Sequence, residues 1–153
     1  MTNRGLGTNV ICQIGLVVRD INRSIEAYSQ VFGLPKPEII VTEGPEVART
    51  KFRGSPTDAR AKLAFFDMGQ LSLELIEPVG GPSTWREFLD QKGEGVHHMA
   101  FVVQDTDEAV SFLEGAGIEV IQQGDYTGGR YTYLDSVSLL GVVLELLENF
   151  DNE

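Results

Sequence analysis

The feature that most limits the fold of this chain is an internal repeat. Residues 13–28 (QIGLVVRDINRSIEAY) align without gaps with residues 98–113 (HMAFVVQDTDEAVSFL), and in both stretches an aspartate follows the apolar run. Later in the chain, residues 71–77 (LSLELIE) match residues 142–148 (VVLELLE). A sequence with two related halves is expected to fold as two copies of one supersecondary unit.

Both halves show a strand pattern, a helical pattern and then further strand patterns. Asp20 and Asp105 stand just before the helical patterns, where an aspartate caps the first turn. We predict helices over about residues 22–32 and 107–114, and a short helix from Ser83 or Thr84 to Gly93 or Gly95. The other apolar segments predict strands at about 38–42, 47–53, 61–67 and 71–77, and at about 118–122, 131–135 and 142–148.

These patterns predict an α+β fold in a single domain over residues 1–153. Two tandem βαβββ modules, 10–78 and 95–148, are joined by a linker at 79–94. We expect their strands to pair into one curved mixed sheet with the helices outside and a pocket on the concave face. The first module is longer by 14 residues between equivalent positions (61 against 47), and we place the extra residues within 44–62.

The charge of the chain excludes some classes of partner. A net charge of −11 and a pI near 4.5 disfavour nucleic acids and anionic membranes. No apolar run is long enough to span a membrane and the start lacks the apolar core of a signal peptide, so we expect a cytoplasmic protein. The single cysteine, Cys12, excludes an internal disulfide and receives no role.

Four polar residues occupy strand positions that the repeat relates in pairs. Alternation along the first strand directs Ile14 and Leu16 toward the helices and Gln13 toward the concave face. The same alternation in three other strands directs Glu74, His98 and Glu145 to that face. We call these four residues the candidate ligand set.

A divalent cation is the simplest partner for the candidate ligand set. Two neighbouring carboxylates removed from water need a compensating charge, and no lysine or arginine interrupts these strands beside them. Three oxygen ligands and one nitrogen suit Mg, Mn, Fe, Co, Ni or Zn. Taken singly, each residue is typical of the solvated side of a strand, and it is the combination that indicates a site.

Three other polar residues near the candidate ligand set are interpreted as structural. His97 precedes the ligand histidine, so alternation places it on the opposite face, where we expect packing or exposure. Glu77 and Glu148 fall near strand ends and are expected to be solvated.

The sequence resembles the vicinal oxygen chelate superfamily, which includes glyoxalases, methylmalonyl-CoA epimerases, extradiol dioxygenases and bleomycin-resistance proteins. The resemblance covers about residues 10–148 and rests on QIGLVVRDINRSIEAYSQVFGL, LELIEP, GEGVHHMAFVVQD and GGRYTYLDSVSLLGVVLELLE. It implies that the candidate ligand set binds a divalent metal. It also implies a homodimer acting on a small molecule, such as an acyl-CoA or another anionic thioester.

The activity that this resemblance favours is proton transfer beside a carbonyl or thioester, closest to that of methylmalonyl-CoA epimerase. Glu145 is the expected base and Glu74 the opposed partner. Such epimerases usually carry histidine at position 13 and glutamine at position 74, whereas the order Gln, Glu, His, Glu resembles zinc-dependent glyoxalase I. A glyoxalase-type lactoylglutathione lyase is therefore the alternative enzyme, and a binder resembling bleomycin-resistance proteins is the non-catalytic alternative.

Several cationic and aromatic residues are candidates for contact with a substrate. Arg130 follows two glycines in GGRYTY and is the residue we expect to bind a carboxylate or phosphate. Added positive charge in the first module would suit an anionic substrate and comes from Lys51, Arg53, Arg60 and Lys62. Residues 48–54 (ARTKFRG) carry cationic side chains where epimerases of this family have a second acid or base. Trp85 and Phe88 are expected to be core residues.

Overall fold

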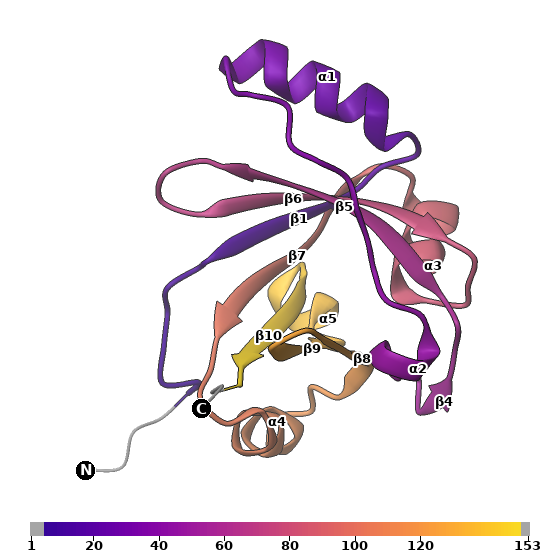
Figure 1. Cartoon of the computed structure of the whole chain (residues 1–153). Coiled ribbons are helices and arrows are strands. Elements are labelled where there is room, and N and C mark those ends of the chain that lie inside the picture. The colour runs from indigo at the N-terminus through magenta and orange to yellow at the C-terminus, as the bar shows by residue number, and fades with distance from the viewer. Residues whose placement is uncertain (1–4, 151–153) are drawn as a thin grey trace.

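The computed structural model describes residues 5–150 and shows one curled, ten-stranded mixed sheet with helices packed against it (Figure 1). The strand order is β2-β5-β6-β1-β7-β10-β9-β8-β3-β4. The strands are β1 (Gln13–Val17), β2 (Ile40–Val41), β3 (Lys51–Phe52), β4 (Ser55–Pro56), β5 (Arg60–Asp67), β6 (Ser72–Val79), β7 (Gly95–Val102), β8 (Val120–Tyr126), β9 (Gly129–Leu134) and β10 (Val143–Asn149). The helices are α1 (Ile21–Phe32), α2 (Pro45–Ala48), α3 (Thr84–Lys92), α4 (Thr106–Gly115) and α5 (Val137–Leu140).

The internal repeat of the sequence is visible in the pairing of the strands. β1 pairs in parallel with β6, and β7 pairs in parallel with β10. The two halves meet where β1 and β7 pair antiparallel at the centre of the sheet. α1 packs on β5 and β6, and α4 packs on β10. The predicted α+β fold with a curved mixed sheet is confirmed, and α1 and α4 lie outside the sheet as expected.

The predicted strand at 47–53 is wrong over most of its length. Pro45 begins the short helix α2 there, and only β3 remains extended. β3 and β4 form a hairpin that pairs with β8 of the second half. The extra residues of the first module thus extend the far edge of the sheet, which local sequence patterns do not specify.

Acidic residues at equivalent positions of the two halves bind the N-terminal turns of α1 and α4. Asp20 accepts hydrogen bonds from the first turn of α1, and Asp105 accepts one from the first turn of α4, as predicted. Glu77 Oε1 also accepts from the backbone N–H of Ile21 at 2.9 Å, and Glu148 Oε1 accepts from that of Thr106 at 3.0 Å. Glu77 and Glu148 therefore tie their strands to the helix starts and are half-buried, which corrects the expectation that both are solvated.

The core lies on both faces of the sheet. On the convex side, one apolar cluster includes Ile21, Phe66 and Leu75 under α1, and another surrounds Phe101 and Leu146 under α4. On the concave side, α3 packs a third cluster against the sheet, and its buried members are Val17, Ala61, Ile76, Trp85, Leu89, Tyr133 and Val143. Trp85 is a core residue as predicted, and α3 fills one end of the concave face.

Within residues 5–150, no helix has the length and apolar character that crossing a membrane requires.

The helix contacts of Glu77 and Glu148 lead to a stability prediction. Replacing either residue with alanine leaves the first N–H of a helix without its carboxylate acceptor, and we expect the free energy of unfolding to fall by about 1–2 kcal/mol. Urea denaturation measures the change. Glu77→Gln and Glu148→Gln keep an acceptor oxygen and should lose less. Glu119→Ala, at an exposed position in the loop before β8, is the matched control and should stay near the wild type.

Candidate metal centre

A β-bulge places both histidines of the chain on the same side of β7. His98 lies opposite Gly15 of β1 and Val96 lies opposite Leu16, so His97 is an extra residue without a partner on β1. The Nδ1 atoms of the two imidazoles are 2.8 Å apart. The expectation that His97 faces away from His98 is therefore wrong, because the bulge interrupts the alternation. His97 is buried, with an exposed fraction of 1%.

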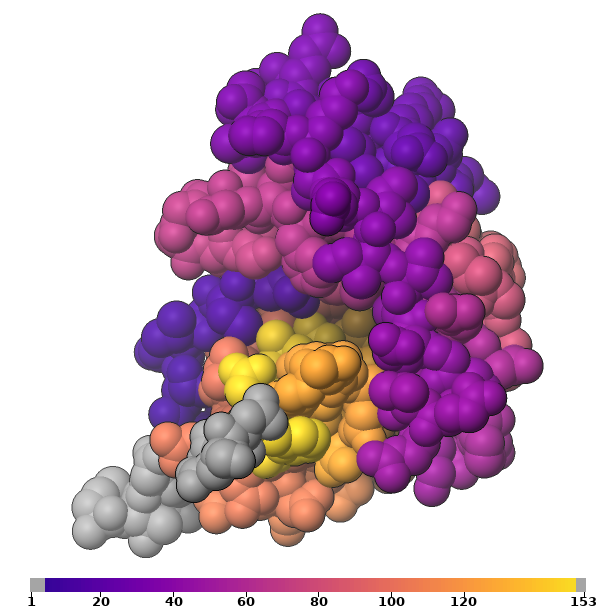
Figure 2. Space-filling view, in the orientation of Figure 1, coloured from indigo at the N-terminus to yellow at the C-terminus, as the bar shows by residue number. Residues whose placement is uncertain are grey.

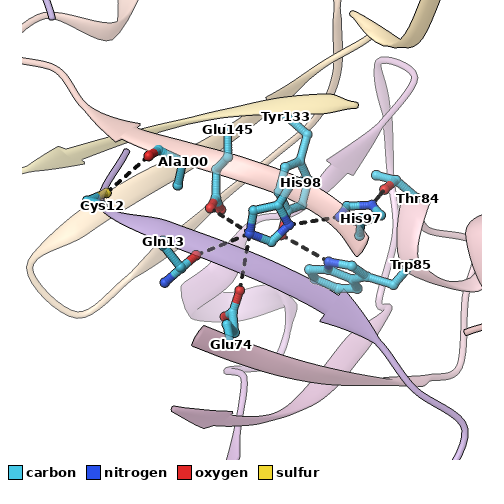
Figure 3. Close-up of polar contacts among 10 residues, drawn as sticks. All are labelled: Cys12, Gln13, Glu74, Thr84, Trp85, His97, His98, Ala100, Tyr133 and Glu145. Carbon is cyan, nitrogen blue, oxygen red and sulfur yellow. Dashed lines mark hydrogen bonds and ion pairs between the residues drawn. The ribbon is translucent and has the colours of Figure 1, made fainter. Parts of the chain in front are cut away.

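The four members of the candidate ligand set converge from four neighbouring strands (Figure 3). His98 Nε2 lies 3.0 Å from Glu145 Oε1, 3.3 Å from Glu74 Oε1 and 3.1 Å from Gln13 Oε1. The carboxylates and the imidazole are buried, and one ligand atom from each lies within 4.8 Å of the others. The structure thus brings together all four residues that the repeat relates.

Gly15 makes room for the His98 imidazole. A Cβ atom at this position would lie 2.0 Å from His98 Cε1 and within 2.6 Å of both ring nitrogens. A side chain on β1 would therefore displace the ring. Our interpretation of the sequence assigned Gly15 no role, although a glycine inside a strand is a signal of close approach by another group.

The buried carboxylates favour a positive charge among them. Burial and the neighbouring charge of Glu145 raise the pKa of Glu74, against the opposing effect of His98. Burial alone would lower the pKa of His98, but the charge and hydrogen bond of Glu145, with those of Glu74, raise it to about 10. Burial and the charge of His98 lower the pKa of His97 well below its usual value, so His97 is neutral.

The orientation of Gln13 tests whether the candidate ligand set suits a cation. Its amide oxygen faces only acceptor atoms, and the reversed amide would donate to Glu74 at 3.2 Å, Glu145 at 3.0 Å and His98 Nε2 at 3.1 Å. The acceptor atoms that face one another here therefore need either N–H donors or a bound cation between them. Ligands about 2.1 Å from a cation, at adjacent octahedral positions, lie about 3.0 Å apart. The distances of 3.0–3.3 Å from His98 Nε2 to the three oxygens are compatible with that value, and the set of three oxygens and one nitrogen fits a divalent metal.

A cavity of about 510 Å³ opens over this centre, with Gln13, Glu74 and Glu145 in its wall. Figure 2 shows a hollow between the magenta first half and the orange and yellow second half. The first half contributes an apolar wall that includes Ile40, Val41, Leu63 and Phe65, and the second half contributes Tyr126, Thr127, Tyr131 and Tyr133. The cavity offers mainly apolar surface with a few polar groups, as small-molecule sites do.

Among the described residues 5–150, no lysine or arginine lines this cavity. Arg130 forms an ion pair with Asp125 at 2.8 Å instead, and Arg49 pairs with the same carboxylate at 2.8 Å. Arg53 pairs with Glu87, and Arg60 donates to the backbone oxygen of Thr42. The structure therefore places Arg130 outside the cavity wall, because an acidic neighbour on β8 holds its guanidinium.

Comparison with known proteins identifies similar sequences and structures. A family model described as the Glyoxalase/Bleomycin resistance protein/Dioxygenase superfamily matches residues 12–133. The protein YqjC of Bacillus subtilis (strain 168) is 29% identical over 144 residues, covering 92% of this chain and 92% of that protein. A 2-epi-5-epi-valiolone epimerase of Actinomyces sp is 27% identical over 156 residues, covering 96% of this chain and 84% of that protein.

A solved structure with a bound ligand is also similar. Streptomyces coelicolor methylmalonyl-CoA epimerase in complex with 2-nitronate-propionyl-CoA is 26% identical, with a TM-score of 0.63. The match covers 92% of this chain and 97% of that one.

The contact between Gly15 and His98 gives a prediction. Gly15→Ala forces the imidazole out of place, and overpacking of this kind should lower the free energy of unfolding by about 1–3 kcal/mol. Urea denaturation measures the loss. Gly115→Ala, in α4, meets no atom within 4 Å and serves as the control, with unchanged or slightly raised stability expected. Equal stability of Gly15→Ala and the wild type would contradict the packing described above.

Proposed function

The chain belongs to the glyoxalase/bleomycin resistance protein/dioxygenase superfamily, and from this premise we propose that it is a divalent-metal-dependent epimerase or isomerase. Its reaction is the removal of a proton from a carbon beside a carbonyl or thioester and the return of that proton. The observation that carries the proposal is the convergence of two buried carboxylates, an imidazole and an amide at the floor of a cavity. The similarity to proteins named as epimerases supports it.

Gln13, Glu74, His98 and Glu145 would hold the metal. The three oxygens and one nitrogen accommodate Zn, Co, Ni, Mn, Fe or Mg. When bound, the cation supplies Lewis-acid stabilisation of the negative charge that develops on the substrate oxygen.

Glu145 and Glu74 are the proposed proton-transfer groups. Both carboxylates line the cavity, and they come from equivalent strands of the two halves, β10 and β6. We assign to Glu145 the removal of the proton from the substrate carbon and to Glu74 the opposed position. The surrounding apolar and aromatic side chains limit the access of water to the reacting carbon.

The proposed substrate is a small carbonyl compound or an acyl thioester. Because no cationic side chain from the part of the chain that the structure describes lines the cavity, the phosphate groups of an acyl-CoA would lie outside it. Arg49 has a side chain that is 73% exposed, and it is close enough to Asp125 of the cavity wall to meet such a group at the opening. Arg130, the substrate-binding residue that we expected, has a less exposed side chain, at 33%.

A glyoxalase-type lyase is the second candidate, and the identity of the first-half ligands favours it. Gln13 and Glu74 resemble the pair found in zinc-dependent glyoxalase I. Its chemistry uses the same proton removal beside a carbonyl, on a thiol adduct of a 2-oxoaldehyde. The two candidates therefore differ in substrate and share the base.

Proton exchange tests the role of Glu145. We expect the metal-loaded wild type to exchange the α-proton of methylmalonyl-CoA, or that of the glutathione hemithioacetal of methylglyoxal, in deuterated water. Glu145→Gln removes the base and should lower the exchange rate by about 100-fold or more. Proton NMR measures the exchange, and metal content is measured on the same samples. Unchanged exchange in a metal-loaded Glu145→Gln protein would remove this residue from the mechanism.

Metal content separates an enzyme of this type from a non-catalytic binder. We expect about one divalent ion per chain after gentle purification, with loss of the ion in Glu74→Ala and His98→Ala because each removes a ligand. Elemental analysis gives the ratio. Glu87→Gln changes an exposed carboxylate on α3 and should keep the metal. A wild type that neither retains nor binds added metal would favour the binder.

A further inference from the structure

His97 is the neighbour of His98 on β7 and is not a member of the candidate ligand set. Its Nδ1 atom lies 2.8 Å from Nδ1 of His98, and its Nε2 atom is hydrogen-bonded to Thr84 Oγ1 (Figure 3). Each nitrogen of the His97 ring therefore has one polar partner.

The contact between the two Nδ1 atoms requires one proton. His98 Nε2 faces the oxygens of Gln13, Glu74 and Glu145, so its lone pair must be free if it is to bind a cation. The proton of a neutral His98 ring then lies on Nδ1, and it is donated to His97 Nδ1. His97 must carry its own proton on Nε2, which donates to Thr84 Oγ1. The contacts thus define one tautomer for each ring.

The surroundings of His97 hold its ring in place. Phe88 and Tyr133 pack edge to face against it, with centroids at 5.4 and 5.0 Å. Thr84, the first residue of α3, is fixed by its backbone N–H, which donates to Gln122 Oε1 at 2.8 Å. Gln122 in turn donates to Tyr131 OH at 3.0 Å. The chain of contacts begins at the candidate ligand set and ends at a hydroxyl group of the cavity wall.

A neutral acceptor suits the charge of this site. Metal-bound histidines usually donate their second N–H to a carboxylate, a backbone carbonyl or a water. Glu74 and Glu145 already balance the charge of a divalent ion, and a third carboxylate would leave a buried negative charge without a partner. An imidazole accepts the same hydrogen bond without adding charge.

We propose that His97 is a positioning residue that fixes the His98 tautomer with Nε2 free for the metal. The inference rests on the proposed function, since it assumes that His98 binds a cation. The role is specific to the acceptor nitrogen of His97 and differs from a packing role of its ring.

The test compares three variants of the full chain by calorimetric titration with Co²⁺. His97→Phe keeps an aromatic ring and removes the acceptor, and we expect the dissociation constant to rise about 10–100-fold. His97→Asn places an amide oxygen near the position of Nδ1 and should recover most of the affinity. Phe88→Leu alters the packing against His97 without touching a hydrogen bond and should bind Co²⁺ like the wild type. Circular dichroism confirms that each variant is folded.

A second measurement on the wild type does not depend on the folding of any variant. Long-range proton–nitrogen NMR of the Zn²⁺-loaded protein should show His98 protonated on Nδ1, and His97 protonated on Nε2 with Nδ1 bare. A proton on Nδ1 of His97, wild-type affinity in His97→Phe, or an equal loss in Phe88→Leu would overturn the inference and leave the proposed function standing. A wild type that binds neither Co²⁺ nor Zn²⁺ would overturn both.

Discussion

Two carboxylates buried side by side govern the interior of this protein. Glu74 and Glu145 have exposed fractions of 7% and 4%, and a carboxylate so far removed from water is costly without a positive partner. The Nε2 atom of His98 contacts both carboxylates, and the amide of Gln13 contacts the same nitrogen atom. The centre is therefore stable only with a bound cation or a proton on the imidazole, and this requirement explains why its residues face one another.

The duplicated sheet brings the two buried carboxylates and His98 together. β1 and β7 run antiparallel at the centre of the sheet, and each pairs in parallel with the strand that carries a glutamate. Glu74 and His98 lie opposite Gly15, whereas Gln13 and Glu145 lie opposite Ala100, two residues further along β7. One residue from each of four adjacent strands thus reaches the same part of the concave face. The duplication also fixes the outer layer, since Glu77 and Glu148 bind the first N–H groups of α1 and α4 from those same two strands. Site and helices are held by the same pair of strands.

Much of the fold and of the candidate site could be predicted because the relevant signals are local. The alternation of apolar residues gave the orientation of Glu74 and Glu145, and the aspartates gave helix starts within one residue of those observed for α1 and α4. Alternation failed for His97, where a bulge shifts the register. It also failed for residues 47–53, where Pro45 begins a helix and the following hairpin pairs with a strand of the other half. The partner of Glu77 is 56 residues away in the sequence, so no local pattern identifies it.

The sequence by itself determined the duplicated architecture and the four residues that converge, because both follow from a repeat and from the two-residue period of a strand. Only the tertiary structure decided which atoms surround His98. The bulge in β7, the absence of a side chain at Gly15 and the start of α3 at Thr84 together set the two imidazoles in contact. It also decided that Asp125 of the cavity wall pairs with both Arg49 and Arg130, and that neither arginine is among the described residues that line the cavity. These features arise from contacts between different strands and helices, and such contacts exist only once those elements have packed together around the site.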